Sequence, residues 1–478
     1  MNHNRVLVPA ALMLLAVGCE RSADRIAGTS FKVSAAATAG KGTIGINVAL
    51  RAAPTAVQLA ELGTYGNVQG RLQQINALFM RASESQLPAI QALPYVLAAN
   101  PDAKREGPPL DGVAVTNFAN GFSTWDLDAI NVMSAPLTAA RAVPFDGSGV
   151  YIGVLDTGLL DSWRLYFPQE RIAAQFAKSF GGGGAGGTNV SEQPNKWEHD
   201  QSSHGTHVTS TILGYQLGVN RINGVAPRAT VIPVKVLNQN GSGWSSAIAQ
   251  GIVYIADLKA GPLAGHPVVI NMSLGGSVLD AVEKAAVDYA VGKGVIIVAA
   301  AGNAGNAGMH FPGAYAPVIS AAASGWINEW QPGADGNPVN WWLVDNVPEP
   351  TSASDFYIAG FSSRQKAGQD LDVAAPGSWV VGPFQLNSAA GRPTYFFLGG
   401  TSMASPHVAG IVALMAQKDP ALTASQAETI LESTAIPLPA GCRSVRPVPG
   451  VAAQNICWGD DASGHGLATA DAALAATP

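Results

Sequence analysis

The stretch VYIGVLDTG, residues 150–158, decides the fold class, because a short continuous apolar run ends there in an acidic turn. Similar Val/Ile-rich runs follow it at residues 231–237, 268–272, 295–300 and 318–322. Helical patterns occur between them at residues 245–258 and 278–291. Continuous apolar strands that alternate with helices predict a parallel sheet covered on both faces. We therefore expect an α/β fold with a parallel central sheet flanked by helices.

Asp156 lies at the carboxyl end of the first predicted strand. Parallel sheets gather their ligands and catalytic groups at that edge, which makes Asp156 a candidate functional carboxylate. An aspartate in a turn also accepts hydrogen bonds from its own backbone, and for a single residue this structural role is the commoner one. Asp156 therefore needs partners from elsewhere in the chain before it can be given a function.

The stretch EHDQSSHGTHV, residues 198–208, offers a base. His204 is followed by a glycine and begins an apolar helical pattern, so its ring can point into a cleft and accept a proton. The histidines and carboxylates crowded here also suggest a metal site built from His199, His204 and His207. Because no His-Glu-x-x-His arrangement is present, the general base is the favoured interpretation and a metallohydrolase is the alternative.

The stretch GGTSMASPHVAG, residues 399–410, offers a nucleophile. Its glycines deliver Ser402 to the start of a helical segment that runs through Met415, beside backbone N–H groups without helical acceptors. The stretch AAAGN, residues 299–303, ends a buried strand in Asn303, whose amide can donate a hydrogen bond to an oxyanion. Turn formation also explains each of these residues when it is taken alone.

Together these candidates occur in the order Asp156, His204, Asn303, Ser402, each at a strand end or a helix start. The motifs LDTG (155–158), HGTHV (204–208) and GTSMASPHVAG (400–410) resemble the signatures of the subtilisin-like serine proteases. The resemblance implies a subtilisin-like fold and a serine endopeptidase. In it Ser402 attacks, His204 is the base, Asp156 orients the base, and Asn303 with the Ser402 N–H receives the oxyanion.

The resemblance extends from about residue 117 to residue 478, which we expect to form the catalytic domain. The segment NMSLGG, residues 271–276, can pair through its backbone with an extended peptide. It is similar to the family's substrate-aligning segment, so Ser273, Leu274 and Gly275 are the expected substrate-binding residues. The resemblance requires no cofactor for the chemistry. It allows a structural calcium ion, but we assign no residue to a metal.

Two stretches interrupt the family's pattern. A glycine-rich surface loop is expected between Asp156 and His204, from Gly181 to Gly187 and on through the polar residues to Asn195. A Trp-rich insertion at residues 326–355 contains Trp330, Trp341 and Trp342. Its tryptophans can form a binding surface or pack on the body of the domain, and packing is the favoured interpretation.

Residues 43–106 form a separate small α+β unit in this interpretation. Strands are expected at residues 44–50, 75–80 and 94–100, with a short helix at 83–93 that Ser83 caps. The unit resembles the inhibitory propeptide of subtilisin-like proteases, which implies a zymogen that is its own intramolecular inhibitor. Autoprocessing is expected between about Lys104 and Trp125. Residues 104–122 are expected to be an exposed linker.

Residues 1–18 have the layout of a signal peptide, and residues 19–42 that of a flexible linker. Cys19 stands in a sequence that resembles a bacterial lipoprotein cleavage box, so secretion and anchoring at the cell envelope by a lipidated Cys19 both stay open. Cys442 and Cys457 then remain as an even pair. In an oxidising compartment they are expected to form a disulfide, with two free thiols as the alternative.

Composition excludes some partners. The chain of 478 residues has a formal net charge of −6, from 27 Lys and Arg against 33 Asp and Glu. It therefore lacks the basic footprint of a nucleic-acid-binding protein. The resemblance to subtilisin-like proteases implies polypeptide substrates and the chain's own propeptide as partners.

Overall fold

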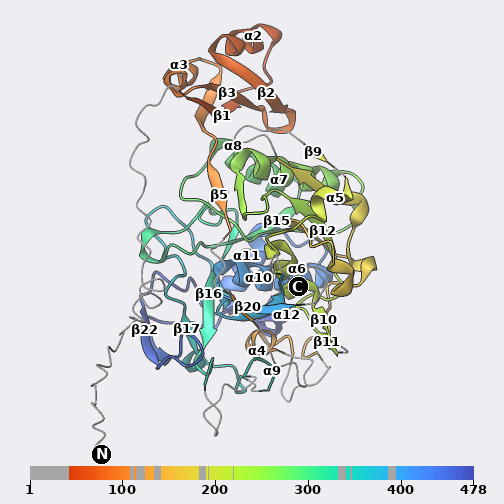
Figure 1. Cartoon of the computed structure of the whole chain (residues 1–478), viewed down its shortest axis with the longest axis vertical. Coiled ribbons are helices and arrows are strands. Elements are labelled where there is room, and N and C mark those ends of the chain that lie inside the picture. The colour runs from red at the N-terminus through yellow and green to blue at the C-terminus, as the bar shows by residue number, and fades with distance from the viewer. Residues whose placement is uncertain are drawn as a thin grey trace, which may run out of the picture.

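The computed structural model describes residues 42–107, 112–114, 124–133, 141–181, 190–191, 193–218, 220–331, 341–344, 347–385 and 394–478. It has two parts, a small N-terminal unit and a larger body (Figure 1). The expected signal peptide, Cys19 and almost all of the first linker lie outside the described residues. So do residues 182–189 and 192 of the expected glycine-rich loop.

The body is built on a mostly parallel sheet, as expected. Within the described residues its strand order is β17-β16-β15-β14-β7-β12-β8-β9, with β18 also paired to β16. The strands are β7 (Tyr151–Asp156), β8 (Lys178–Phe180), β9 (Val190–Ser191), β12 (Thr230–Lys235), β14 (Val268–Met272), β15 (Val295–Ala300), β16 (Ile319–Trp326), β17 (Phe356–Ile358) and β18 (Val373–Pro376). Only β9 and β17, at the two ends, pair in the antiparallel sense. The predicted strands are confirmed, with boundaries shifted by a few residues.

Helices cover both faces of this sheet, which confirms the α/β prediction. One face packs against α7 (Ser245–Ala260) and α8 (Ala281–Gly292), and the other against α6 (His204–Leu213) and α10 (Thr401–Lys418). Alternating side chains of β7 point to opposite faces: Leu155 joins the α7 and α8 core, while Ile152 and Val154 join the α6 and α10 core. The continuous apolar strands follow from this double burial.

The strand order reverses beside β7. The chain runs from β7 to β8 and β12 on one side and then crosses to β14 on the other. A crevice forms at the carboxyl ends of the strands where the order of a parallel sheet reverses. Asp156, the last residue of β7, lies at this point.

The N-terminal unit is an antiparallel sheet of order β2-β3-β1-β4 with two helices. Its elements are β1 (Thr43–Leu50), α2 (Ala56–Tyr65), β2 (Gly66–Leu72), β3 (Ala77–Ser83), α3 (Leu87–Gln91) and β4 (Val96–Pro101). The expected strands near β1, β3 and β4 are present. The sequence analysis missed α2, which begins with a capping box of Thr55 and Gln58, and β2.

The expected capping role of Ser83 is wrong. Ser83 has an extended backbone, ends β3, and makes no cap hydrogen bond. The chain passes through a 3-10 turn (Glu84–Gln86) before α3 begins, so the helix is shorter than expected. The pairing of β3 with β1 extends to Ser83 and holds that residue in the sheet instead of a helix cap.

The N-terminal unit sits on the outer helices of the body, and Figure 1 shows it beside α8. Its sheet places Ala77 and Phe79 in the same apolar cluster as Val282 and Ala286 of α8. Burial of Phe79 is nearly complete at 1% exposure, so this contact is well packed.

The Trp-rich insertion packs on the body, as expected. Trp326, Trp330, Trp341 and Trp342 are all buried. The Trp341 ring is stacked on Phe397 at a centroid distance of 5.5 Å, and Trp330 lies edge-on to Trp379 at 5.5 Å. These described tryptophans therefore form part of the core rather than an exposed binding surface.

The expected linker after the N-terminal unit is partly structured, which corrects that expectation. Two short strands lie in it, β5 (Lys104–Glu106) and β6 (Gly112–Ala114). The first pairs with β13 (Ser242–Trp244), and the second joins β19 (Val380–Pro383) and β20 (Tyr395–Leu398) in a small sheet. Both strands attach the chain to the body because their backbone groups find partners there.

The remaining described elements are short or C-terminal. Besides short 3-10 helices, they are α4 (Trp125–Ala129), α5 (Pro194–Trp197), β10 (Tyr215–Leu217), β11 (Asn220–Ile222), α9 (Trp341–Val344), α11 (Ala424–Thr434), β21 (Gly441–Val445), β22 (Gln454–Trp458) and α12 (Ala470–Ala476). Cys442 and Cys457 face each other across the β21–β22 hairpin and form the expected disulfide. None of the helices in the described part of the chain is long and apolar enough to cross a membrane.

Candidate active site

Asp156 and His204 form a buried pair at the strand-order reversal. Asp156 Oδ1 lies 2.8 Å from His204 Nδ1, and the exposed fractions of the two residues are 0% and 1%. The backbone N–H of Thr157 also donates to Asp156 Oδ1, at 2.7 Å. Burial lowers the pKa of His204, but the charge and hydrogen bond of Asp156 outweigh it and leave that pKa above its ordinary value.

The local backbone explains why His204 faces Asp156. Ser203 precedes α6 in the left-handed conformation, with φ of 64°, and Asp200 Oδ1 accepts its backbone N–H at 2.8 Å. The next residue, Gly205, packs on the turn after β7: a Cβ atom there would lie 2.4 Å from the carbonyl oxygen of Gly158. Only glycine allows this close approach, which brings the start of α6 against the end of β7.

Ser402 lies in the first turn of α10, as expected. Its Oγ donates to the backbone carbonyl of Ser273 at 3.1 Å, and Ser273 Oγ donates to the carbonyl of Ser402 at 2.7 Å. His204 Nε2 is buried and has no hydrogen-bond partner within the described residues. A serine–histidine hydrogen bond is therefore not formed in this conformation, and the ring nitrogen is left ready to accept a proton.

Asn303 is oriented by the residue before Ser402. Its Oδ1 accepts hydrogen bonds from the backbone N–H and the hydroxyl of Thr401, at 2.9 and 3.0 Å. The backbone N–H of Gly302 donates in turn to Thr401 Oγ1 at 3.1 Å. Because the amide group is planar, its NH2 points away from Thr401. The sequence analysis missed this role of Thr401, because a threonine beside the candidate nucleophile carries no signal of its own.

The segment expected to pair with an extended peptide pairs with the chain's own strand β5. Glu106 and Gly275 exchange two backbone hydrogen bonds, of 3.1 and 3.3 Å. On its other side β5 pairs with β13 in the antiparallel sense. Strand β5 therefore lies between β13 and the segment that contains Gly275. A Cβ atom on the following residue, Gly107, would lie 3.7 Å from His204 Cε1. Residues 104–107 therefore fill the groove beside His204.

The structure does not assemble the alternative metal site from His199, His204 and His207. His207 is buried, and its Nε2 lies 3.2 Å from the carbonyl of Val380. Burial lowers the pKa of His207 to about 3, so it is a neutral side chain held in the core. His199 is exposed, and these three histidines do not form a metal-binding group within the described residues.

A group of three carboxylates elsewhere in the body has the spacing of possible metal ligands. Single oxygen atoms of Asp370, Asp372 and Glu428 lie within 4.8 Å of one another. Asp372 is buried, and its Oδ1 makes no hydrogen bond within the described residues. Burial also raises the pKa of Asp372 to about 8. Oxygen ligands of this kind suit a hard cation, which would act on stability.

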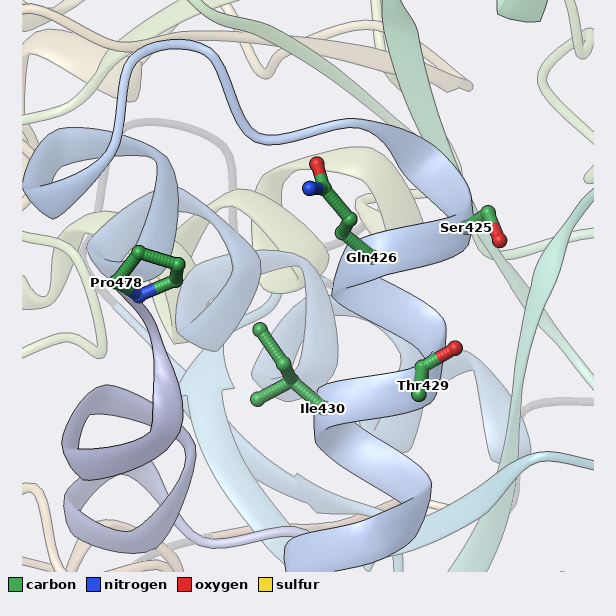
Figure 2. A pocket seen from close by; sticks show the side chains of 5 residues that line it. All are labelled: Ser425, Gln426, Thr429, Ile430 and Pro478. Atoms are coloured by element: carbon green, nitrogen blue, oxygen red, sulfur yellow. The ribbon is translucent and has the colours of Figure 1, made fainter.

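A surface depression beside α11 lacks the acid–base side chains found around Asp156 and His204 (Figure 2). It has a volume of about 190 Å³ and is lined by Ser425, Gln426, Thr429, Ile430 and Pro478. None of the five lining residues has a carboxylate, imidazole or amine side chain, so no side-chain base lies beside its hydroxyl groups.

Comparisons with known proteins agree with the motifs. Residues 147–475 match the Subtilase family. The chain is 33% identical to thermitase of Thermoactinomyces vulgaris over 61% of its own length and 82% of that protein. It is 30% identical to subtilisin E of Bacillus subtilis (strain 168) over 77% of its own length and 78% of that protein.

Solved structures give the same result for the fold. Fervidolysin from Fervidobacterium pennivorans, described as a keratinolytic enzyme related to subtilisin, superposes with a TM-score of 0.62 and 23% identity. The match covers 93% of this chain and 63% of that one. The S41 psychrophilic protease superposes with a TM-score of 0.54 and 29% identity, over 74% of this chain and 99% of that one.

Proposed function

Since this chain belongs to the subtilase family and is a serine endopeptidase, we propose that it cleaves polypeptides with Asp156, His204 and Ser402 as its catalytic triad. The observation that carries the proposal is the buried 2.8 Å contact between Asp156 and His204 at the strand-order reversal. Ser402 lies in the first turn of α10 and is hydrogen-bonded to Ser273, which follows the neighbouring strand β14. The chemistry of the family requires no cofactor.

The proposed roles are those that the resemblance implies, and the contacts of Asp156 and Ser402 are compatible with them. Ser402 Oγ leaves the carbonyl of Ser273, transfers its proton to His204 Nε2 and attacks the peptide carbonyl carbon. Asp156 keeps the other ring nitrogen protonated and stabilises the imidazolium that forms. His204 then gives the proton to the leaving amine as the C–N bond breaks. Water, deprotonated by the same histidine, hydrolyses the acyl-enzyme and restores Ser402.

The negative oxygen of the tetrahedral intermediate needs donors. We infer that the NH2 of Asn303 and the backbone N–H of Ser402 supply them. The two hydrogen bonds from Thr401 to Asn303 Oδ1 support this role, because they hold the amide in one orientation. A donor that is already oriented needs no reorganisation during the reaction.

Substrate alignment is the proposed role of Ser273, Leu274 and Gly275. The pairing of Gly275 with Glu106 supports it, because an extended substrate can form the same two backbone hydrogen bonds. Backbone pairing positions a substrate without selecting its side chains.

We also propose that residues 43–106 are an inhibitory propeptide and residues 117–478 the catalytic domain. The insertion of residues 326–355 belongs to that domain. Three observations support this division: the N-terminal unit has its own sheet and core, it packs on α7 and α8, and β5 fills the groove beside His204. Autoprocessing between about Lys104 and Trp125 would release the groove.

Export is the remaining part of the proposal. The signal-peptide layout of residues 1–18 supports secretion, and the exposed disulfide of Cys442 and Cys457 supports an oxidising compartment. Lipid anchoring through Cys19 is the alternative to release. Mass spectrometry of the mature N-terminus distinguishes the two and also identifies the processing bond.

The decisive test replaces Ser402 by Ala. We expect Ser402→Ala to leave a full-length precursor that does not hydrolyse unfolded casein and does not react with a sulfonyl fluoride. The matched control is Ser433→Ala, because Ser433 is exposed on α11 and bonds only to its own helix. Undiminished hydrolysis by Ser402→Ala would refute the assignment. Loss of activity to a chelator without reaction with the sulfonyl fluoride would favour the metallohydrolase instead.

A further inference from the structure

Strand β5 carries a buried ion pair at one position of the groove. Arg105 is 1% exposed, and its guanidinium meets the carboxylate of Glu283, which is 0% exposed. Arg105 Nε donates to Glu283 Oε1 at 3.1 Å, and Nη2 donates to Glu283 Oε2. The two residues are 178 positions apart, so the contact belongs to the docking of β5 and not to local structure.

The pocket around Arg105 fits a guanidinium. The carbonyl of Val278 accepts from Nη2 at 3.1 Å. Gly276 forms one wall of this pocket, because a Cβ atom built on it would lie 2.7 Å from Arg105 Nη1. A side chain at residue 276 would therefore collide with the guanidinium, and its absence leaves room for the planar group. Planar bidentate pairing of this kind is specific for arginine.

Glu283 belongs to the catalytic body and not to the strand that now covers it. It lies in the first turn of α8 and receives no hydrogen bond besides those of Arg105 among the described side-chain contacts. When β5 leaves the groove, this carboxylate loses its counter-charge in a pocket that was closed to water. The departure of β5 also opens the pocket, so the group favoured there is a basic one that covers Glu283 again and restores the two charge-assisted hydrogen bonds.

We propose that Glu283 selects substrates with an arginine at the position that Arg105 occupies on β5. The inference rests on the proposed function, because it assumes that substrates replace β5 in the groove. Arg105, which pairs with Gly243, comes two residues before Gly107. A Cβ atom built on Gly107 would lie 3.7 Å from His204 Cε1. The scissile carbonyl belongs to the residue at that position or to the one after it. The selected arginine is therefore the third or fourth residue before the cleaved bond.

The first experiment maps cleavage sites. The processed wild-type enzyme is incubated with a peptide mixture of known sequences, and the products are identified by mass spectrometry. We expect arginine to be enriched at one upstream position, the third or the fourth before the bond. The same mixture treated with Ser402→Ala shows the background.

The second experiment measures how the positive charge of the selected substrate side chain affects cleavage. One cleaved peptide is resynthesised with arginine, lysine, citrulline or leucine at the selected position. Because a hydrogen-bonded charge contributes about 1.5–3 kcal/mol, we expect kcat/KM for arginine to exceed that for citrulline by about 10- to 100-fold. Glu283→Gln should reduce this ratio to about threefold or less. Asp288→Asn is the matched control, since Asp288 is an exposed carboxylate on the same helix, and it should retain the ratio.

The outcomes separate the two proposals. Cleavage of many peptides without an arginine preference overturns the role of Glu283 and leaves the protease assignment intact. Wild-type enzyme that cleaves nothing beyond the Ser402→Ala background removes the protease assignment and this inference together. If Glu283→Gln does not mature, the wild-type ratio of arginine to citrulline decides alone, and a ratio near one refutes the proposal.

Discussion

His204 is the residue at which burial and charge act in opposite directions. Desolvation lowers its pKa, and the adjacent Asp156 carboxylate raises it by a larger amount. Asp200 adds a second negative charge in the same direction. The balance leaves the imidazole more basic than in water, which suits the general-base role that we propose for His204.

This balance predicts a pH profile. Only the neutral imidazole can act as the base, so kcat/KM should rise with pH through the His204 pKa. Because that pKa is raised, we expect the midpoint of the acid limb above the ordinary value of about 6.5. Asp156→Asn should lower the midpoint and reduce kcat by roughly four orders of magnitude. The measurement is kcat/KM from pH 5 to pH 9, and a wild-type midpoint below the ordinary value would contradict this account.

At the scale of the elements, the Trp-rich insertion contains a buried carboxyl group with a strongly raised pKa, that of Glu329. Glu329 is fully buried and accepts hydrogen bonds from the backbone of Trp326 and the hydroxyls of Tyr357 and Ser378, at 3.0, 2.8 and 2.9 Å. Burial raises its pKa to about 8 in spite of these donors. The insertion is therefore packed around a carboxyl group that keeps its proton at neutral pH.

The insertion should make stability depend on pH. Between the unfolded pKa of about 4.5 and the folded pKa of about 8, the folded protein binds the proton that the unfolded chain releases. The free energy of unfolding therefore falls as pH rises through this window, by an amount on the order of a few kcal/mol for this group. We expect Glu329→Gln to reduce this loss, because its amide keeps two of the acceptor contacts without titrating.

Urea denaturation at pH 5 and pH 8 measures the effect, with both proteins carrying Ser402→Ala to prevent autolysis. Asp372 and Asp128 have raised pKa values of about 8 and about 7, so the dependence should shrink in the variant without vanishing. An equal loss of stability in both proteins would show that Glu329 is ionised in the folded state.

At the scale of the whole molecule, the N-terminal unit is joined to the body through two helix starts. Asp102 accepts the backbone N–H of Ser246 at 3.0 Å, in the first turn of α7. Asn47 and Asn100 donate to Asp280, the N-cap residue of α8, at 2.8 and 2.7 Å. The unit therefore completes the caps of two helices that belong to the body.

Removing the first of these contacts should loosen the unit. In the Ser402→Ala precursor, Asp102→Ala removes a cap worth about 1 kcal/mol. We expect amide hydrogens of residues 43–101 to exchange roughly fivefold faster, because local opening becomes easier. Glu84→Ala, a change at an exposed residue of the same unit, is the control. Equal exchange rates in the two variants would show that the cap does not hold the unit in place.

The sequence alone determined the fold class, the four candidate residues and the disulfide pair. The strands are buried on both faces, so their apolar runs are continuous and visible without a structure. The turn at Asp156 and the helix starts at His204 and Ser402 depend on neighbouring glycines, which are equally local signals. The predicted element boundaries were less accurate in the N-terminal unit than in the body. There β3 continues through Ser83, a residue at which the local sequence pattern favours a helix cap.

Only the tertiary structure decided what occupies the groove. Residues 104–107 have the composition of a linker, yet their backbone pairs with Gly275 and β13 and their arginine is buried against Glu283. The sequence around Arg105 and Glu283 does not predict that they form a buried ion pair, because a charged side chain in a loop or on a helix is ordinarily solvated. The contact exists because the fold brings the start of α8 beside the groove and closes the pocket to water. Local sequence thus indicated the candidate residues for the chemistry, and long-range packing decided that Arg105 occupies the pocket beside Glu283.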